Sequence, residues 1–222
     1  MRRALAGPDE DALAAKPLPE LRAYAADHPQ SYPAQMALGR ALLKSAAPDE
    51  AAQAFQRAAA LVPTARGDRS PHAMLAQIAL QKNDRARAIA ELTSLVAVDY
   101  DNLAAARKLA SLLHEAGSEL TAGFAGVHER ILSIDPFDGD AHRVVGRSLM
   151  QSNQADAAAR EFRAVLALGP VDQAAAHTDL AESYFKSGKR AEAKKQTLAA
   201  LEIAPTYERA QELLLKLAGG QR

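Results

Sequence analysis

Six histidines are the residues of this chain best suited to metal binding or to acid-base chemistry. They are His28, His72, His114, His128, His142 and His177. A helix presents a pair of metal ligands when two histidines stand three or four residues apart, and no two of these histidines do. His114-Glu115 and His128-Glu129 also lack the second histidine that a zinc-peptidase helix requires. We therefore predict no metal site and no cofactor.

Other catalytic arrangements are equally absent from the sequence. It has no Gly-rich phosphate loop, no nucleophile elbow and no Asp-rich calcium loop. The chain has no cysteine, which excludes disulfides, thiolate catalysis and cysteine-ligated zinc. The many carboxylates alternate with Lys and Arg, as in residues 182–195, and this pattern is typical of a solvated helix surface. We predict no catalytic residue and no enzymatic activity.

The composition favours helices. Alanine is the commonest residue, Leu, Glu, Arg, Gln and Lys supply much of the remainder, and Trp is absent. These are strong helix formers, so we expect an all-α protein. The 27 basic and 27 acidic residues balance, so no long-range field favours nucleic acid or anionic lipid. No run of 18 apolar residues could span a membrane, and we predict neither nucleic-acid binding nor membrane insertion.

Prolines mark an internal period. Each of Pro29, Pro63, Pro136, Pro170 and Pro205 closes an apolar helical stretch. The interval is 34 residues from Pro29 to Pro63 and from Pro136 to Pro170, and 35 from Pro170 to Pro205. The interval of 73 residues between Pro63 and Pro136 fits two units and five further residues.

The same residue types recur at the same offset from each closing proline. The first unit has Leu38, Gly39, Leu42, Ala51, Phe55 and Ala58, and the fourth has Val145, Gly146, Leu149, Ala158, Phe162 and Val165. Small residues at Gly39 and Gly146 would let the two helices of a hairpin approach closely, while Phe55 and Phe162 would fill the space between successive hairpins. Residues that tolerate a left-handed backbone are expected to end the first helix of four units: Asn83, Gly117, Asn153 and Gly188.

This pattern resembles the tetratricopeptide repeat, a helix-turn-helix family, from about residue 32 to residue 207. The resemblance implies a right-handed superhelical α-solenoid in which each hairpin stacks on its neighbours. The predicted parts are a disordered segment at 1–18, a half-repeat helix at 19–31, repeats at 32–65, 69–102, 103–138 (with an insertion), 139–172 and 174–207, and a capping helix at 207–218.

The resemblance also implies that the first helix of each hairpin lines a concave groove. The predicted peptide-binding residues are Met36, Arg40, Leu43, Lys44, Gln77, Leu80, Arg107, Ser111, His114, Arg143, Arg147, Met150 and Phe185. Basic and apolar residues dominate this set, with Glu182 the main acidic residue among the groove positions. Such a groove suits a carboxylate-bearing protein or peptide with apolar anchors. The alternative is that these are ordinary solvated side chains.

Two details limit what the resemblance transfers. The family's two-carboxylate clamp uses Lys, Asn and Arg. This chain has no asparagine at the positions where that pattern would be sought, which are occupied by Arg40, Ala73, Gln77 and Arg107, so we do not transfer the clamp. His72, His142 and His177 share one position of the repeat, an aromatic site in the family pattern. We therefore predict that these histidines contribute to helix packing.

The leading hypothesis is a non-catalytic scaffold or adaptor for protein-protein interaction. The alternatives are an accessory module of a larger enzyme, such as a bacterial peptidase, or of a secretion or assembly machine, and a scaffold that self-associates into a homo-oligomer. The basic start at Arg2 and Arg3 is interrupted by Gly7 and Pro8, so we expect no signal peptide. A cytoplasmic location follows, or a periplasmic one if a leader has been removed.

Overall fold

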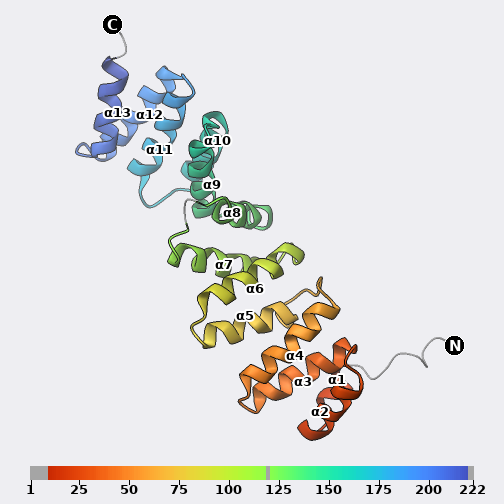
Figure 1. Ribbon diagram of the computed structural model, residues 1–222. Helices are drawn as coiled ribbons and strands as arrows, with labels where there is room; N and C mark the ends of the chain where they lie inside the picture. Colours follow the sequence, from red (N-terminus) through yellow and green to blue (C-terminus); the bar gives the residue numbers. More distant parts are fainter. Residues whose placement is uncertain (1–9, 119–120, 220–222) are drawn as a thin grey trace, which may run out of the picture. The chain divides into compact units, whose positions relative to one another are not determined.

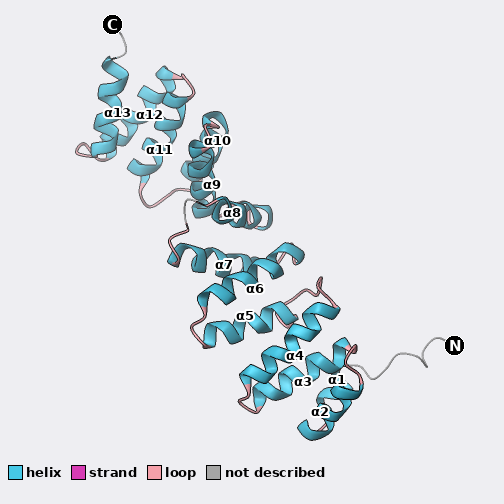
Figure 2. Ribbon diagram, in the orientation of Figure 1, coloured by secondary structure: helices cyan, strands magenta, loops and turns pink. Residues whose placement is uncertain are grey.

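The computed structural model describes residues 10–118 and 121–219 of the chain. In these residues every regular element is an α-helix (Figure 2), which confirms the predicted fold class. The 13 helices of this described part are α1 (Glu10–Ala14), α2 (Leu18–Asp27), α3 (Tyr32–Lys44), α4 (Pro48–Leu61), α5 (Pro71–Gln81), α6 (Arg85–Val98), α7 (Leu103–Glu115), α8 (Ala122–Ile134), α9 (Gly139–Gln151), α10 (Ala155–Ala167), α11 (Gln173–Lys186), α12 (Arg190–Ile203) and α13 (Glu208–Gly219).

Within each compact part of the chain, the helices pack in the order in which they occur (Figure 1). The chain divides into two compact units, residues 1–112 (unit one) and residues 113–222 (unit two), and the boundary falls within α7. In unit one α1 and α2 both pack on α3, and α3 to α6 then pack each on the next. In unit two the same succession runs from α8 to α13. Sequential pairing of short helices is the arrangement expected of a helical repeat array.

A phenylalanine of the second helix covers a glycine of the first in two of the hairpins. A Cβ atom added to Gly39 would lie 2.6 Å from the Phe55 ring, and one added to Gly146 would lie 2.6 Å from the Phe162 ring. The predicted close approach is therefore confirmed. The prediction that these rings fill the space between successive hairpins is incomplete, because each ring first fills the gap inside its own hairpin. Phe162 also reaches the next hairpin, where it belongs to a core cluster with Leu180.

The turns between paired helices use the left-handed backbone that the sequence predicted. The φ angles are 58° at Asn83, 59° at Asn153, 69° at Gly117 and 79° at Gly188. Ala46 adopts φ 54° after α3, although a Cβ atom disfavours this region. Sequence reasoning therefore missed this turn, because alanine carries no signal for it.

The N-terminal segment requires a correction. Disorder was predicted for residues 1–18, but α1 lies within them and its Leu13 side chain is completely buried in the core that includes Met36 of α3. The prediction is therefore wrong for the α1 residues, and it lies outside the described residues for positions 1–9. Leu13 gives this short helix an apolar anchor, although it is the only buried residue of α1.

The C-terminal helix α13 covers the last hairpin. Ala210, Leu213 and Leu217 are buried, and Leu213 and Leu217 form a core cluster with Ala181 and Ala193 of the preceding pair. The opposite face of α13 is polar, with Glu212 and Lys216 exposed. Among the described helices, none combines the length and the apolar character needed to cross a membrane.

Candidate functional site

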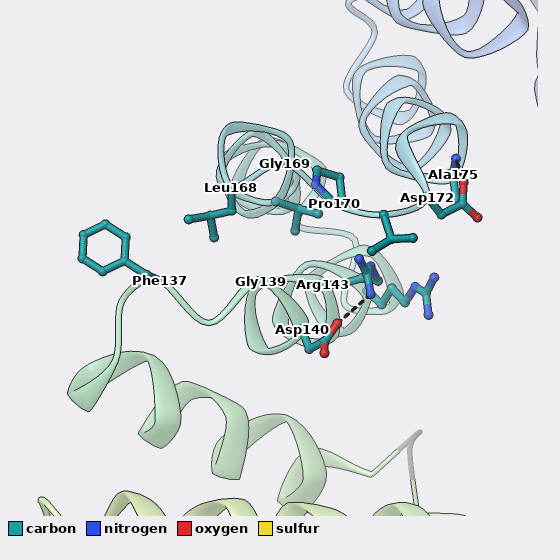
Figure 3. A pocket seen from close by; sticks show the side chains of 12 residues that line it. Phe137, Gly139, Asp140, Arg143, Leu168, Gly169, Pro170, Asp172 and Ala175 are labelled. Carbon is teal, nitrogen blue, oxygen red and sulfur yellow. Dashed lines mark hydrogen bonds and ion pairs between the residues drawn. The ribbon is translucent and has the colours of Figure 1, made fainter. Parts of the chain in front are cut away.

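A cavity of about 560 Å³ opens in unit two, beside the first turn of α9 (Figure 3). Its walls come from α9, from the loop between α8 and α9, from the loop between α10 and α11, and from one residue near each end of that second loop, Val165 of α10 and Ala175 of α11. The lining residues are Phe137, Gly139, Asp140, Arg143, Arg147, Val165, Leu168, Gly169, Pro170, Val171, Asp172 and Ala175.

Three exposed apolar side chains stand around this cavity. Phe137 is 77% exposed, Leu168 is 38% exposed and Val171 is fully exposed. Phe137 and Val171 each follow the closing proline of a repeat, 34 positions apart. Large apolar side chains that gather on one surface mark sites of protein or ligand contact more often than isolated ones do. We refer to Phe137, Leu168 and Val171 as the apolar rim.

Local hydrogen bonds fix the loops that carry the apolar rim. The Asp138 carboxylate accepts a hydrogen bond of 2.9 Å from the Ala141 backbone N–H and caps α9, and Asp172 caps α11 in the same way through Ala175 at 2.9 Å. Such caps satisfy backbone N–H groups that lack a partner within the helix. Beside Phe137, the Pro136 carbonyl lies 2.9 Å from His142 Nε2. The cavity walls are therefore held in place by the protein itself.

The two arginines of the cavity differ in how firmly they are held. Arg143 Nη1 donates a 2.8 Å hydrogen bond to Asp140 Oδ1 (Figure 3). Arg147 is 57% exposed at its side chain and lies 3.5 Å from Asp179, a long contact for a charged pair. Asp179 has a closer partner in Arg209, at 2.8 Å. Arg147 is therefore the more weakly held of the two guanidinium groups.

Arg209 of α13 neutralises the buried acid beside Arg147. Its Nη2 lies 2.8 Å from both Asp179 and Glu182. Burial alone would lower the pKa of Arg209, but the hydrogen bonds that Arg209 donates to Glu182 and Asp179 outweigh burial and raise it. Arg209 thus stays charged and holds Asp179 whether or not Arg147 does.

A second cavity, of about 220 Å³, adjoins the other side of Arg147. It is lined by Arg147, Met150, Gln151, Phe162, Asp179, Glu182 and Arg209. Arg147 is the only residue common to the linings of the two cavities. An occupant of either cavity would therefore meet the same guanidinium.

Comparison with protein families identifies the helical array. The tetratricopeptide repeat model matches residues 18–66, 73–138 and 146–214, which is most of the chain. The chain belongs to the tetratricopeptide repeat family. Members of this family generally act in protein-protein interaction and are typically non-catalytic, and the matching model is a repeat family and not an enzyme family.

Several solved structures are similar to this chain. YrrB, described as a TPR protein with an unusual peptide-binding site, is 15% identical, with 88% of this chain and 98% of that chain covered and a TM-score of 0.50. Pseudomonas aeruginosa pilF is 15% identical, with 88% and 86% covered and a TM-score of 0.48. The Cut9 and Hcn1 assembly of APC/C gives 18% identity, with 90% and 38% covered and a TM-score of 0.46. A search of curated proteins finds no match.

The predicted groove residues of this tetratricopeptide repeat protein divide between the two units. In unit one, Met36 is completely buried, so its prediction as an accessible groove residue is wrong. Leu43 and Leu80 are half-buried on α3 and α5. The exposed members are Lys44, Gln77, Arg107 and Ser111.

In unit two, the structure brings Arg143 and Arg147 into the larger cavity, and Arg147 and Met150 into the smaller one. Phe185 is half-buried, with the Arg190 guanidinium 5.7 Å from its ring centre. His114 is exposed, with its ring 6.5 Å from that of Phe124. Neither of these two residues lines a cavity that contains Arg147.

The sequence predicted few acidic residues near the groove arginines, and this prediction is wrong for three of them. Arg40 pairs with Glu10, Arg143 with Asp140, and Arg147 with Asp179. Asp140 of α9 and Asp179 of α11 were missed because neither was among the positions of the first helices that were considered for the groove. The apolar rim was also missed, although an apolar residue directly after a closing proline, as in Pro136-Phe137, is a signal that sequence reasoning could have used.

The histidines of the tetratricopeptide hairpins pack as predicted. Nδ1 of His142 lies 2.7 Å from Glu161, Nδ1 of His72 lies 2.8 Å from Glu91, and Nδ1 of His177 lies 2.7 Å from Gln196. Each partner is on the second helix of the same hairpin. In the described part of the chain, no three His, Asp or Glu side chains gather in a way that would hold a metal ion.

Proposed function

We propose that this tetratricopeptide repeat protein binds a protein segment in the larger cavity of unit two. The segment places an apolar side chain against the apolar rim and a carboxylate on Arg147. Arg147 carries this proposal, because it lines both cavities and its contact with Asp179, at 3.5 Å, is long.

The geometry supports an extended or helical segment in preference to a small molecule. The cavity is open, and Phe137 and Val171 project outward from separate loops. Apolar anchors that surround a charged hydrogen-bonding group are typical of segments bound by protein grooves. YrrB, which shares the fold, is described as having a peptide-binding site, and this description is consistent with the proposal.

The segment is expected to carry one carboxylate and not several. Two of the lining residues, Asp140 and Asp172, are acidic and balance the two arginines. Asp172 is committed to capping α11, and Asp140 to Arg143. A strongly acidic segment would therefore meet repulsion beside Arg147, whereas a single carboxylate next to an apolar residue would not.

Selection from a random peptide library tests the proposal. Immobilised wild-type protein should enrich peptides that share an apolar residue and a neighbouring carboxylate. Arg147→Ala should lose the preference for the carboxylate, and Val171→Ser should lose the preference for the apolar residue. Lys194→Ala removes an exposed positive charge of α12 outside both cavities, and it should select the same peptides as wild type.

Identical selections from wild type, Arg147→Ala and Val171→Ser would refute the proposed site. Light scattering across a dilution series tests the alternative that the apolar rim joins copies of this chain. Under the proposal the mass stays that of one chain and is unchanged by Val171→Ser. A larger mass that falls in this variant would assign the rim to self-association instead.

A further inference from the structure

A separate contact in unit one holds α1 against α3. Leu13 is the only buried residue of α1, and its neighbours Asp11 and Ala14 are exposed. Leu13 belongs to the same core cluster as Met36 and Leu42 of α3. One leucine therefore supplies the whole apolar anchor of a helix that is too short to be stable alone.

The second anchor of α1 is a carboxylate. Glu10 forms an ion pair with Arg40 of α3, and Arg40 also donates a 3.4 Å hydrogen bond to the Arg69 carbonyl. A cavity of about 440 Å³ beside this pair is lined by Glu10, Asp11, Tyr32, Arg40, Arg66, Arg69 and Ser70. Three of these lining residues are arginines, and they lie beside Glu10 and Asp11 at the start of α1. The carboxylates of α1 therefore occupy a basic site.

This contact is weakened by desolvation. Burial raises the pKa of Glu10, and the attraction to Arg40 only partly opposes this effect. The charged form of Glu10 is therefore less stable in this contact than it would be in water. Because this contact consists of one leucine and one partly desolvated carboxylate, α1 is weakly held and can detach from α3 while the rest of unit one stays folded.

We propose that α1 is a displaceable intramolecular ligand of unit one. The site under α1 accepts a helical segment of a partner protein in which a carboxylate precedes a leucine by three residues, as Glu10 precedes Leu13. In the isolated protein α1 occupies this site. A partner segment of the same chemistry displaces α1 and takes its contacts with Arg40 and the α3 core.

This proposal does not rest on the cavity of unit two, since every residue that it uses lies in unit one. Because α1 and a partner segment compete for the same site, α1 masks this site from the partner. Residues 15–17 join α1 to α2, which itself packs on α3, and a segment tethered this close to its site competes as if it were present at roughly millimolar concentration. A free peptide therefore binds weakly until the contacts of α1 are removed.

Binding of a fluorescent peptide with the sequence of Glu10–Lys16 tests the proposal in the chain of 222 residues. Leu13→Ser removes the apolar anchor of α1, and Ala14→Ser makes a similar change at an exposed position of the same helix. The peptide should bind Leu13→Ser at least about tenfold more tightly than wild type or Ala14→Ser. Adding Arg40→Gln to Leu13→Ser should abolish this gain. Equal affinity for Leu13→Ser and Ala14→Ser, or a gain that survives Arg40→Gln, would overturn the proposal.

Thiol labelling gives a second measurement that needs no peptide. The chain has no cysteine, so Leu13→Cys, Ala14→Cys and Ala58→Cys each report on one position. Ala58 is completely buried in the core of unit one and reports on unfolding of that unit. Leu13→Cys should be labelled more slowly than Ala14→Cys and at least about tenfold faster than Ala58→Cys, because α1 detaches without unfolding the unit. Equal rates for Leu13→Cys and Ala58→Cys would show that α1 is an integral part of the fold and would overturn the proposal.

Discussion

The Phe162 ring lies over Gly146 so closely that a Cβ atom at Gly146 would be 2.6 Å from the nearest ring carbon. The same relationship, at the same distance, joins Phe55 to Gly39. In both hairpins the glycine stands on the first helix and the ring comes from the second. Close helix contact within the hairpin thus depends on a pair of residues that the repeat reproduces.

Gly146→Ala should destabilise unit two. The new methyl group meets a ring that is 98% buried, and overpacking of this kind costs about 1–3 kcal/mol. Phe162→Ala should cost about 3–5 kcal/mol through the cavity that it leaves. Urea denaturation measures both changes in the free energy of unfolding.

Gly126→Ala is the matched control for this prediction. Gly126 is an exposed residue of α8 with open space around its missing Cβ atom. Alanine there should be neutral or stabilising by up to about 1 kcal/mol, because glycine is a poor helix former. If Gly146→Ala were as stable as Gly126→Ala, the close contact with Phe162 would be wrong.

Arg209 and Arg147 should differ in their effect on stability. Arg209→Ala removes the 2.8 Å partner of Asp179, whose side chain is only 5% exposed, and should cost about 1–3 kcal/mol. Arg147→Ala and Arg143→Ala should each change the free energy of unfolding by less than about 0.5 kcal/mol, because their carboxylate contacts are long or exposed. Thermal denaturation compares these variants with Lys216→Ala, an exposed change on the same helix as Arg209. A larger loss for Arg147→Ala than for Arg209→Ala would reverse the roles assigned to the two residues.

The His142–Glu161 contact should tolerate an amide. The equivalent contact of the next repeat, between His177 and Gln196, already has one. Glu161→Gln should therefore change the free energy of unfolding by less than about 0.5 kcal/mol, whereas Glu161→Ala should cost about 1 kcal/mol by removing the partner of His142 Nδ1. Equal losses in the two variants, measured by urea denaturation, would mean that this hydrogen bond does not brace the hairpin.

Docking of α1 should weaken as the pH rises. Burial raises the pKa of Glu10 above its ordinary value of 4.5, with Arg40 opposing, so docked α1 holds this proton more tightly than free α1 does. Docking is therefore strongest below pH 4.5 and weakens as the pH passes through the raised pKa. The ratio of the labelling rates of Leu13→Cys and Ala14→Cys, measured with a pyridyl disulfide, should increase from pH 4.5 to pH 7. Glu10→Gln should flatten this increase, and a ratio that falls with pH would contradict the sign.

Much of the fold was predictable because its signals are local and repeated. Proline spacing gave the period, and the small residues at Gly39 and Gly146 predicted close helix contact correctly. The left-handed turns at Asn83 and Gly188 were also predicted, since these residue types tolerate positive φ. The turn at Ala46 was not predicted, because there the surrounding structure overrides the preference of the residue.

The candidate site was predicted only in part. Arg143 and Arg147 were identified from their place in the repeat, and they do line one cavity. Burial of Met36 was missed, because the pattern of α3 alone does not show which other helices, α1 among them, contribute to the core around it. The apolar rim was missed because loop residues such as Val171 lie outside the helical periodicity on which the sequence analysis relied.

The affinity of one selected peptide, with a single carboxylate beside an apolar residue, tests the central claim most directly. Isothermal titration should show binding to wild type and to Lys194→Ala with equal affinity. Arg147→Ala should bind at least about tenfold more weakly, since a hydrogen bond to a charged group contributes about 1.5–3 kcal/mol, while its thermal stability stays near that of wild type. Unchanged affinity of the folded Arg147→Ala protein would contradict the proposed site.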